Sequence, residues 1–303
     1  MTMLTDFLTV ADLEKTADLQ LFANQVVEGL RSGLHASPLK GQSTEFKQHR
    51  QYVPGDEIRR LDWKVFGKTD RFYIREFEEE TNLHATLLLD RSGSMGYRGS
   101  GADHNKLEYA TRLSACLAHL LVQQQDSVGL ITFDERVRRI IPARSRPRHL
   151  RVLISEMAGA ETGGESELSG LFLEVAPKLP RRGMLILISD CFCDASKLLR
   201  SLASLRHANH EVLIFQIWDR DELEFPFRGW TKFECLEKAG AEQLVDPAHL
   251  RTIYLDNLAR FRDELERGCR RHRISLIPTV TDEPYADSLA NYLIARRRTL
   301  RKR

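Results

Sequence analysis

Two acidic residues that end apolar runs are the strongest chemical feature of this sequence. One run, His84–Asp90, leads into Asp90-Arg91-Ser92-Gly93-Ser94, and the other, Met184–Asp190, repeats the same design later in the chain. Carboxylate and hydroxyl oxygens suit a hard cation, Mg²⁺ or Mn²⁺, and an octahedral Mg²⁺ keeps a position open for an acid from another protein. If the two runs are neighbouring strands, the sequence predicts a divalent-cation site made by Asp90, Ser92, Ser94 and Asp190.

Short apolar runs that alternate with amphipathic stretches predict the elements that position these residues. Unbroken apolar strands between helices are typical of a parallel sheet covered on both faces, so residues 83–303 are expected to form a doubly wound, mostly parallel α/β domain. Such sheets bind ligands outside the carboxyl ends of their strands, where the strand order reverses. Residues 1–82, with a helix at 13–30, are expected to form an N-terminal extension packed on this domain, and residues 219–246 a small insertion. The expected strands are 84–90, 127–133, 137–141, 184–190, 212–218 and 274–280, and the expected helices are 106–125, 150–157, 168–179, 195–207, 248–271 and 286–298.

Composition excludes several classes of protein. The 303 residues include 45 Lys and Arg against 43 Asp and Glu, and a net charge of only +2 argues against a protein built mainly to bind nucleic acid. Five cysteines, an odd number, are not typical of a disulfide scaffold. The start of the chain lacks the basic region of a secretory signal, and no apolar run is long enough to predict a membrane span. We therefore expect a reduced, cytoplasmic protein.

The Asp90 motif resembles the metal-ion-dependent adhesion site of the von Willebrand factor type A fold, which is a three-layer, Rossmann-like α/β fold. In that family an Asp-x-Ser-x-Ser loop, a Thr from a second loop and an Asp from a third loop surround the ion. The resemblance implies that Ser92 and Ser94 coordinate the metal directly, and that Asp90 and Asp190 act largely through water. The second loop falls in Thr162-Gly163-Gly164-Glu165-Ser166-Glu167-Leu168, where the family usually has Gly-Gly-Thr-Asp-Leu. This alignment assigns Ser166 to the Thr position, with Thr162 as the alternative.

A second resemblance covers most of the chain from about residue 25. Tyr52–Trp63 (YVPGDEIRRLDW), followed by Thr69-Asp70-Arg71 and Glu76-Phe77-Glu78, is similar to the signature of the bacterial domain of unknown function 58 family. The resemblance implies association with a MoxR-type AAA+ ATPase in a chaperone-like or assembly role on a client protein. An aromatic residue beside arginines is common at binding hot spots, so a docking surface is predicted from Arg59, Arg60 and Trp63. The alternative for this segment is a structural clasp between extension and core.

These patterns together predict a non-enzymatic protein-interaction module that docks partners through a bound Mg²⁺. One alternative is a serine hydrolase that uses Ser94 with Asp190 and a later histidine such as His210 or His272, although the loop is one glycine short of a Gly-x-Ser-x-Gly elbow. Another alternative is a metal-free scaffold.

Two further groups of residues have competing interpretations. Cys191 and Cys193 follow Asp190 without the partner spacing of a zinc site, and they are expected to be loop cysteines. The basic tail 296–303 is expected to be a solvated helix end, with a contact to nucleic acid or anionic lipid as the alternative.

Overall fold

The computed structural model of the protein describes residues 10–34, 48–51, 63–69, 71–76, 83–164, 168–180, 182–237 and 240–300. The chain divides into two compact units, a large one of residues 1–33 and 83–303 and a small one of residues 34–82. In the part of the chain that is described, no helix combines the length and the apolar character needed to cross a membrane.

The small unit contains a two-stranded antiparallel ladder and a short helix. Strand β1 (Gln48–Gln51) pairs with β2 (Tyr73–Glu76), and α2 (Trp63–Thr69) lies between them in the sequence. The rings of Phe66 and Phe72 stack with their centroids 4.4 Å apart, while Trp63 is 60% exposed. Arg59 and Arg60 of the predicted docking surface lie outside the described residues.

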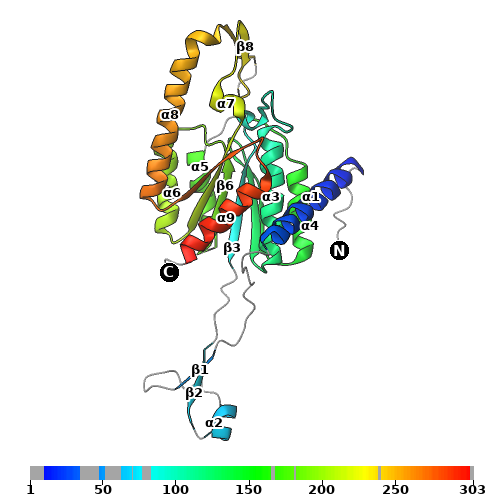
Figure 1. Ribbon diagram of the computed structural model, residues 1–303, viewed down its shortest axis with the longest axis vertical. Coiled ribbons are helices and arrows are strands. Elements are labelled where there is room, and N and C mark those ends of the chain that lie inside the picture. Colours follow the sequence, from blue (N-terminus) through cyan, green and yellow to red (C-terminus); the bar gives the residue numbers. More distant parts are fainter. Residues whose placement is uncertain are drawn as a thin grey trace. The chain divides into compact units, whose positions relative to one another are not determined.

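The large unit is built on a six-stranded sheet in the order β10-β7-β6-β3-β4-β5. Its central strands β6 and β3 are labelled in Figure 1. All neighbouring strands pair in parallel except β5, which pairs antiparallel with β4 at one edge. The predicted doubly wound, mostly parallel sheet is therefore confirmed. Its strands are β3 (His84–Asp90), β4 (Ser127–Phe133), β5 (Val137–Arg144), β6 (Met184–Ser189), β7 (Glu211–Trp218) and β10 (Ser275–Val280).

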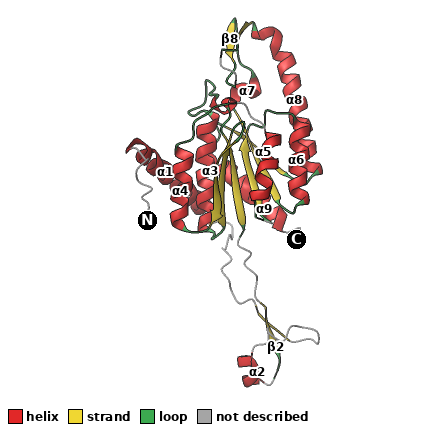
Figure 2. Cartoon of the chain, turned by 180° about the vertical axis from the view of Figure 1, so that it is seen from behind, coloured by secondary structure: helices red, strands yellow, loops and turns green. Residues whose placement is uncertain are grey.

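Helices cover both faces of this sheet and complete a three-layer α/β fold (Figures 1 and 2). Successive side chains of a strand point to opposite faces, so Leu87 and Leu89 of β3 join one apolar cluster and Leu88 joins the other. The first cluster packs under α1 (Val10–Leu34), α3 (Lys106–Gln123), α4 (Pro147–Ala158) and α9 (Tyr285–Leu300). The second packs under α5 (Leu168–Val175), α6 (Ala195–His207) and α8 (Pro247–Arg271). Short 3₁₀ turns, η2 (Gly93–Gly96) and η3 (Ala176–Lys178), follow β3 and α5.

Helix α1 belongs to the large unit, which differs from the predicted boundary between residues 82 and 83. Leu19, Ala23 and Val27 recur every four residues, so they form one stripe along the helix, and all three are buried in the first cluster. Residues 1–82 are thus divided between the two units, because this stripe completes the core beside α3, α4 and α9.

The predicted insertion contains one helical turn and a hairpin at the carboxyl edge of the sheet (Figure 1). Helix α7 (Arg220–Glu224) follows β7, and β8 (Thr231–Glu234) pairs antiparallel with β9 (Glu242–Val245) before α8 begins. The residues just after β8 lie against the loop that follows β3. A Cβ added at Gly93 would stand 2.1 Å from the carbonyl oxygen of Leu236, so only glycine fits at this approach.

Candidate metal centre

The two acid-terminated strands are neighbours at the switch point of the sheet. Strand β3 lies between β4 and β6, and the register aligns Leu89 with Ile188. From β3 the chain continues to β4 on one side, and from β6 it continues to β7 on the other side. In a doubly wound sheet, this reversal of direction opens a crevice at the carboxyl edge. Asp90 ends β3 and Asp190 directly follows β6, and both are fully buried. The predicted meeting of the two carboxylates is therefore confirmed.

Protein groups already hydrogen-bond both oxygens of the Asp90 carboxylate. The Ser92 backbone N–H donates to Oδ1 at 2.9 Å, and the Ser189 hydroxyl donates to Oδ2 at 2.5 Å. Burial, and secondly the negative charge of Asp190, raise the pKa of Asp90 from 3.8 to about 6 despite the opposing hydrogen bonds of Ser189 and Ser92. The ionised form of Asp90 is therefore costly near neutral pH, and a cation beside it would relieve that cost.

Ser92 and Ser94 turn their hydroxyls toward each other beside the two carboxylates. Their Oγ atoms are 3.2 Å apart, which is longer than a typical hydroxyl–hydroxyl hydrogen bond. Two oxygens in adjacent positions of an octahedral Mg²⁺ site, each about 2.1 Å from the ion, lie about 3 Å apart. The spacing of these hydroxyls therefore fits a pair of direct metal ligands.

The second loop is joined to the first by backbone hydrogen bonds. Gly93 N–H donates to the Gly164 carbonyl, and Gly163 N–H donates to the Arg91 carbonyl, both at 2.9 Å. Thr162 lies beside the turn after Ser94, because its Oγ1 would be 3.3 Å from a Cβ added at Gly96. Ser166 falls outside the described residues, so both Ser166 and Thr162 stay predictions for the second-loop ligand.

A buried lysine that the sequence analysis missed lies on the other side of Asp190. Lys106 Nζ donates to Asp190 Oδ2 at 2.8 Å and to Glu222 Oε1 at 2.6 Å, with none of its side chain exposed. Burial alone would lower the pKa of Lys106, but Asp190 and Glu222 outweigh it and raise that pKa above its ordinary value. Lys106 is the first residue of α3, and its two acidic partners come from segments far away in the sequence, so the sequence offered no clear signal for this buried ion pair.

The charges of this cluster leave room for a divalent cation. The Lys106 ammonium pairs with Asp190 and Glu222, and Asp90 adds a third carboxylate close to Asp190, so these four side chains together carry a charge of −2 when all are ionised. Among the described residues, no three His, Cys, Asp or Glu side chains converge as a metal-holding group. A cation here would therefore depend on the two serine hydroxyls together with Asp90 and Asp190, which is the donor set that hard cations prefer.

The cysteines after Asp190 are poor metal ligands. Cys191 is buried with a left-handed backbone (φ 59°), and its N–H donates to the Ser189 hydroxyl at 2.9 Å. Burial raises the pKa of the Cys191 thiol well above its usual value and that of Cys193 to about 12. Burial thus disfavours the thiolate form of both residues in the absence of a metal. The structure agrees with their interpretation as loop cysteines.

The histidines suggested for a hydrolase lie at the wrong edge of the sheet. His210 directly precedes β7, and His272 precedes β10, while Ser94 follows β3. Because these three strands are parallel, both histidines lie at the N-terminal edge, more than about 20 Å along the strands from Ser94. Neither histidine can therefore act as the base for Ser94.

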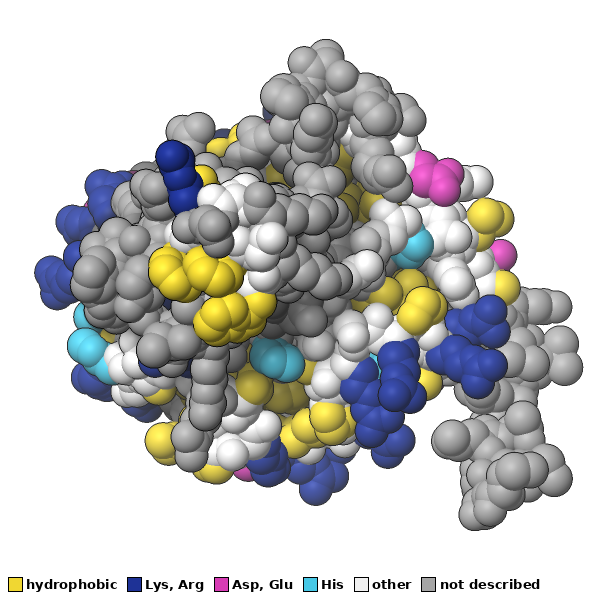
Figure 3. Space-filling model, turned by 90° about the horizontal axis from the view of Figure 1, so that it is seen from below, with side chains coloured by type: hydrophobic (Ala, Val, Ile, Leu, Met, Phe, Trp, Pro, Cys, Tyr) yellow, Lys and Arg dark blue, Asp and Glu magenta, His cyan; other side chains and the backbone are white. Residues whose placement is uncertain are grey.

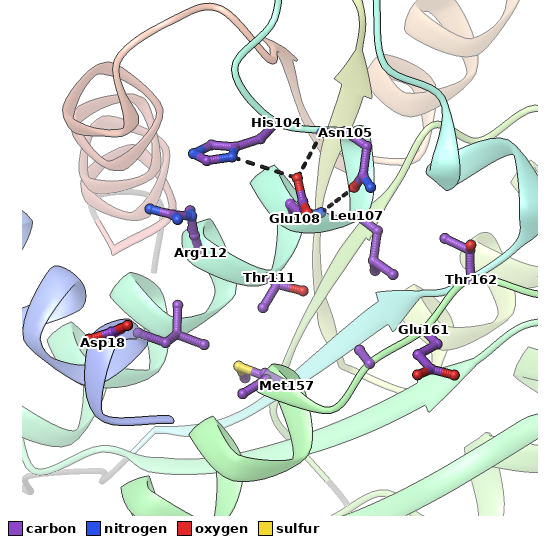
Figure 4. A pocket seen from close by; sticks show the side chains of 13 residues that line it. Asp18, His104, Asn105, Leu107, Glu108, Thr111, Arg112, Met157, Glu161 and Thr162 are labelled. Atoms are coloured by element: carbon purple, nitrogen blue, oxygen red, sulfur yellow. Dashed lines mark hydrogen bonds and ion pairs between the residues drawn. The ribbon is translucent and has the colours of Figure 1, made fainter. Parts of the chain in front are cut away.

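A hollow of about 600 Å³ lies near the second loop, between α1, α3 and the end of α4 (Figure 4). Its charged lining combines Asp18, Glu108 and Glu161 with Arg112, and Thr162 also lines it. Figure 4 shows Asn105 and Glu108 joined in the capping box at the start of α3, and His104 Nδ1 lies 3.6 Å from Glu108 Oε2. This part of the lining therefore has a structural role.

Basic side chains gather at the opposite, N-terminal edge of the sheet (Figure 3). Exposed arginines that precede strands there include Arg182 and Arg273. The prediction of a solvated tail is wrong for Arg296, whose guanidinium donates to Asp126 Oδ2 at 2.9 Å and is 20% exposed. Residues 301–303 lie outside the described residues. The net charge of +2 therefore combines basic side chains at the N-terminal edge of the sheet with acidic side chains at its carboxyl edge.

Comparisons with known proteins identify similar sequences and structures. The protein Rv1480 of Mycobacterium tuberculosis is 26% identical over 92% of this chain and 88% of its own length. Among solved structures, BatB from Bacteroides thetaiotaomicron aligns with a TM-score of 0.48 and 14% identity, covering 71% of this chain and 96% of BatB. The SpRpn10 VWA domain aligns with a TM-score of 0.42 and 13% identity, over 70% of this chain and 95% of that domain. The family model described as "Protein of unknown function DUF58" matches residues 48–275, and the chain therefore belongs to this family.

Proposed function

We propose that this chain is a non-enzymatic protein-interaction module that docks an acidic side chain of a partner through a divalent cation, Mg²⁺ or Mn²⁺. The observation that carries the proposal is the pair of hydroxyls of Ser92 and Ser94, 3.2 Å apart beside the buried carboxylates of Asp90 and Asp190. The fold supports the choice of site, because ligands of doubly wound sheets bind at the switch point.

Each residue of the site has a distinct task in this proposal. Ser92 and Ser94 would hold the ion directly. Both oxygens of Asp90 already accept protein hydrogen bonds, and so do both oxygens of Asp190, from Phe192 N–H and Lys106. These carboxylates would therefore act through water. When bound, the ion supplies positive charge and an open coordination position for the partner's carboxylate.

A binding role is favoured over catalysis by the contacts of Ser94. Its hydroxyl hydrogen-bonds to another serine hydroxyl, that of Ser92, which cannot serve as a general base. The histidines of the hydrolase alternative lie at the other edge of the sheet. The residues around Ser94 thus resemble a ligand cage more than an activated nucleophile.

The proposed partner is a MoxR-type AAA+ ATPase, acting with this chain in the assembly or maturation of a client protein. This identification comes from the family resemblance of the Tyr52–Trp63 segment. Trp63, which is 60% exposed on α2, supports a second contact surface in the small unit. A metal-free scaffold is the competing function, and it predicts partner binding that does not depend on divalent cations.

The metal half of the proposal is tested by calorimetric titration of purified protein with MgCl₂ and MnCl₂. We expect saturable binding by the wild type and at least tenfold weaker binding by the double variant Ser92→Ala/Ser94→Ala. Ser204→Ala, an exposed serine on α6, is the matched control and should bind like the wild type. Equal binding by the double variant and the wild type would place the ion elsewhere and refute the site.

The partner half is tested with the purified protein as bait and a purified MoxR-type ATPase as prey, in Mg²⁺ and again in EDTA. Retention should require Mg²⁺ and be lost in Asp90→Ala, while Asp263→Asn, an exposed carboxylate on α8, should retain the partner. Retention that ignores both EDTA and Asp90→Ala would support the scaffold instead. Loss in Trp63→Ala alone would assign docking to the small unit.

A further inference from the structure

We propose that Lys106 is a built-in competitor of the divalent cation, and that its ammonium on Asp190 sets how tightly the site binds metal. This inference rests on the proposed function and deepens it. It predicts that removing the ammonium tightens metal binding, although the same change removes a buried ion pair.

The geometry holds the Lys106 ammonium in one place. Asn105 caps α3 through a capping box with Glu108, and Lys106 N–H donates to the Tyr97 carbonyl at 3.0 Å, so the backbone of Lys106 is fixed. Its Nζ lies 2.8 Å from Asp190 Oδ2 and 2.6 Å from Glu222 Oε1, and 5.1 Å from the centre of the Phe192 ring. A buried ammonium cannot turn to solvent, so it stays beside Asp190.

The ammonium and a bound cation share one carboxylate. Phe192 N–H occupies Asp190 Oδ1 at 3.1 Å and Lys106 occupies Oδ2, so a divalent ion approaches an Asp190 whose charge is already largely balanced. Like charges near one carboxylate repel, and a neighbouring charge within a few ångströms changes a carboxyl pKa by one to three units. One pKa unit corresponds to a tenfold change in an equilibrium constant, so we expect the ammonium to weaken cation binding about tenfold or more.

Glu222 offers a change in the opposite direction. It is the ammonium's second partner, it belongs to α7, and its Oε2 accepts the Asp219 N–H at 2.8 Å. Glu222→Gln removes one negative charge from the cluster and leaves the ammonium with Asp190 as its single ionised partner. The competition model therefore predicts that Glu222→Gln weakens metal binding while Lys106→Met tightens it. Simple damage to the site would weaken binding in both variants.

The experiment is a calorimetric titration of the full chain with MnCl₂ and MgCl₂, using wild type, Lys106→Met, Glu222→Gln and the control Lys178→Met. Lys178 pairs with Glu174 on the surface at 2.8 Å, so its replacement should leave the affinity unchanged. We expect about tenfold or more tighter binding by Lys106→Met and weaker binding by Glu222→Gln. Affinity that is unchanged or lower in Lys106→Met overturns the inference.

A thermal melt gives a second measurement in case Lys106→Met folds poorly without metal. Saturating Mg²⁺ should raise the melting temperature of Lys106→Met, and of a second variant Lys106→Gln, by more than it raises that of the wild type. If neither variant folds even with Mg²⁺, Lys106 is a structural ion and the inference fails. If wild type and Lys106→Met bind equally, the proposed function stands and the inference fails. If neither binds metal, both fail.

Discussion

Replacing Asp90 by Asn should change how the stability of the protein depends on pH in the absence of metal. Asp90 is fully buried, and its pKa in the folded protein is raised from 3.8 to about 6 by burial and by Asp190. The folded state therefore binds the Asp90 proton more tightly than the unfolded state does. Asparagine keeps the shape and an acceptor oxygen for the Ser92 N–H, but it carries no titrating charge.

The direction and size of the effect follow from proton linkage. The contribution of Asp90 to stability is fully present below pH 3.8 and is lost as pH rises through about 6. The gap between the two pKa values corresponds to about 3 kcal/mol, most of it lost between pH 4 and pH 6. The free energy of unfolding of Asp90→Asn, relative to wild type, should therefore increase by about 2–3 kcal/mol between pH 4 and pH 8.

Urea denaturation in EDTA at half-unit steps from pH 4 to pH 8 measures this difference. Asp263→Asn is the matched control, because Asp263 is exposed on α8 and pairs there with Arg267. That control should follow the wild type at every pH. A difference between Asp90→Asn and wild type that stays constant with pH would show that Asp90 does not titrate between these limits, and the electrostatic account of the site would be refuted.

Three other predictions concern other residues of the large unit. Gly93→Ala should lower the free energy of unfolding, measured in urea, by about 1–3 kcal/mol, because the added Cβ would lie 2.1 Å from the Leu236 carbonyl oxygen. Gly101→Ala is the control, since nothing lies within 4 Å of a Cβ added there, and equal stability of the two variants would contradict the contact at Gly93. Arg296→Ala should lower the free energy of unfolding by about 2 kcal/mol, because the buried Asp126 carboxylate loses its cation. A change below about 0.5 kcal/mol would show that Arg296 is a solvated residue of the tail. In native protein, a maleimide should label Cys235 far faster than the three buried cysteines, as followed by mass spectrometry of the peptides, and comparable rates would disprove their burial.

The sheet was predictable from the sequence because its strands are unbroken apolar runs with clear ends. The ranges expected for 84–90, 127–133 and 195–207 are those of β3, β4 and α6. The meeting of Asp90 and Asp190 was predictable for a related reason. Acids at the ends of two parallel strands converge wherever those strands are neighbours, and the doubly wound order makes them so.

Tertiary partners were not predictable in the same way. The stripe of Leu19, Ala23 and Val27 marks α1 as amphipathic, but the spacing of these residues does not show which part of the protein the helix packs against. Lys106 reads as an ordinary charged residue at a helix start, and only the approach of Asp190 and Glu222 from distant segments makes it a buried ion. Ser189 was likewise hidden inside a strand pattern, although its hydroxyl donates to Asp90.

The place of α1 in the core has a consequence for how the chain is made. Phe22 of α1 meets Tyr285 of α9 edge-on, with ring centroids 5.1 Å apart, although the two residues are far apart in the sequence. During translation, the apolar stripe of α1 leaves the ribosome long before α3 and α9 exist to cover it. Domains generally fold as units once their contacts are available, so this stripe stays exposed through most of synthesis. The burial of this stripe beside α9 is therefore one of the last steps in completing the core.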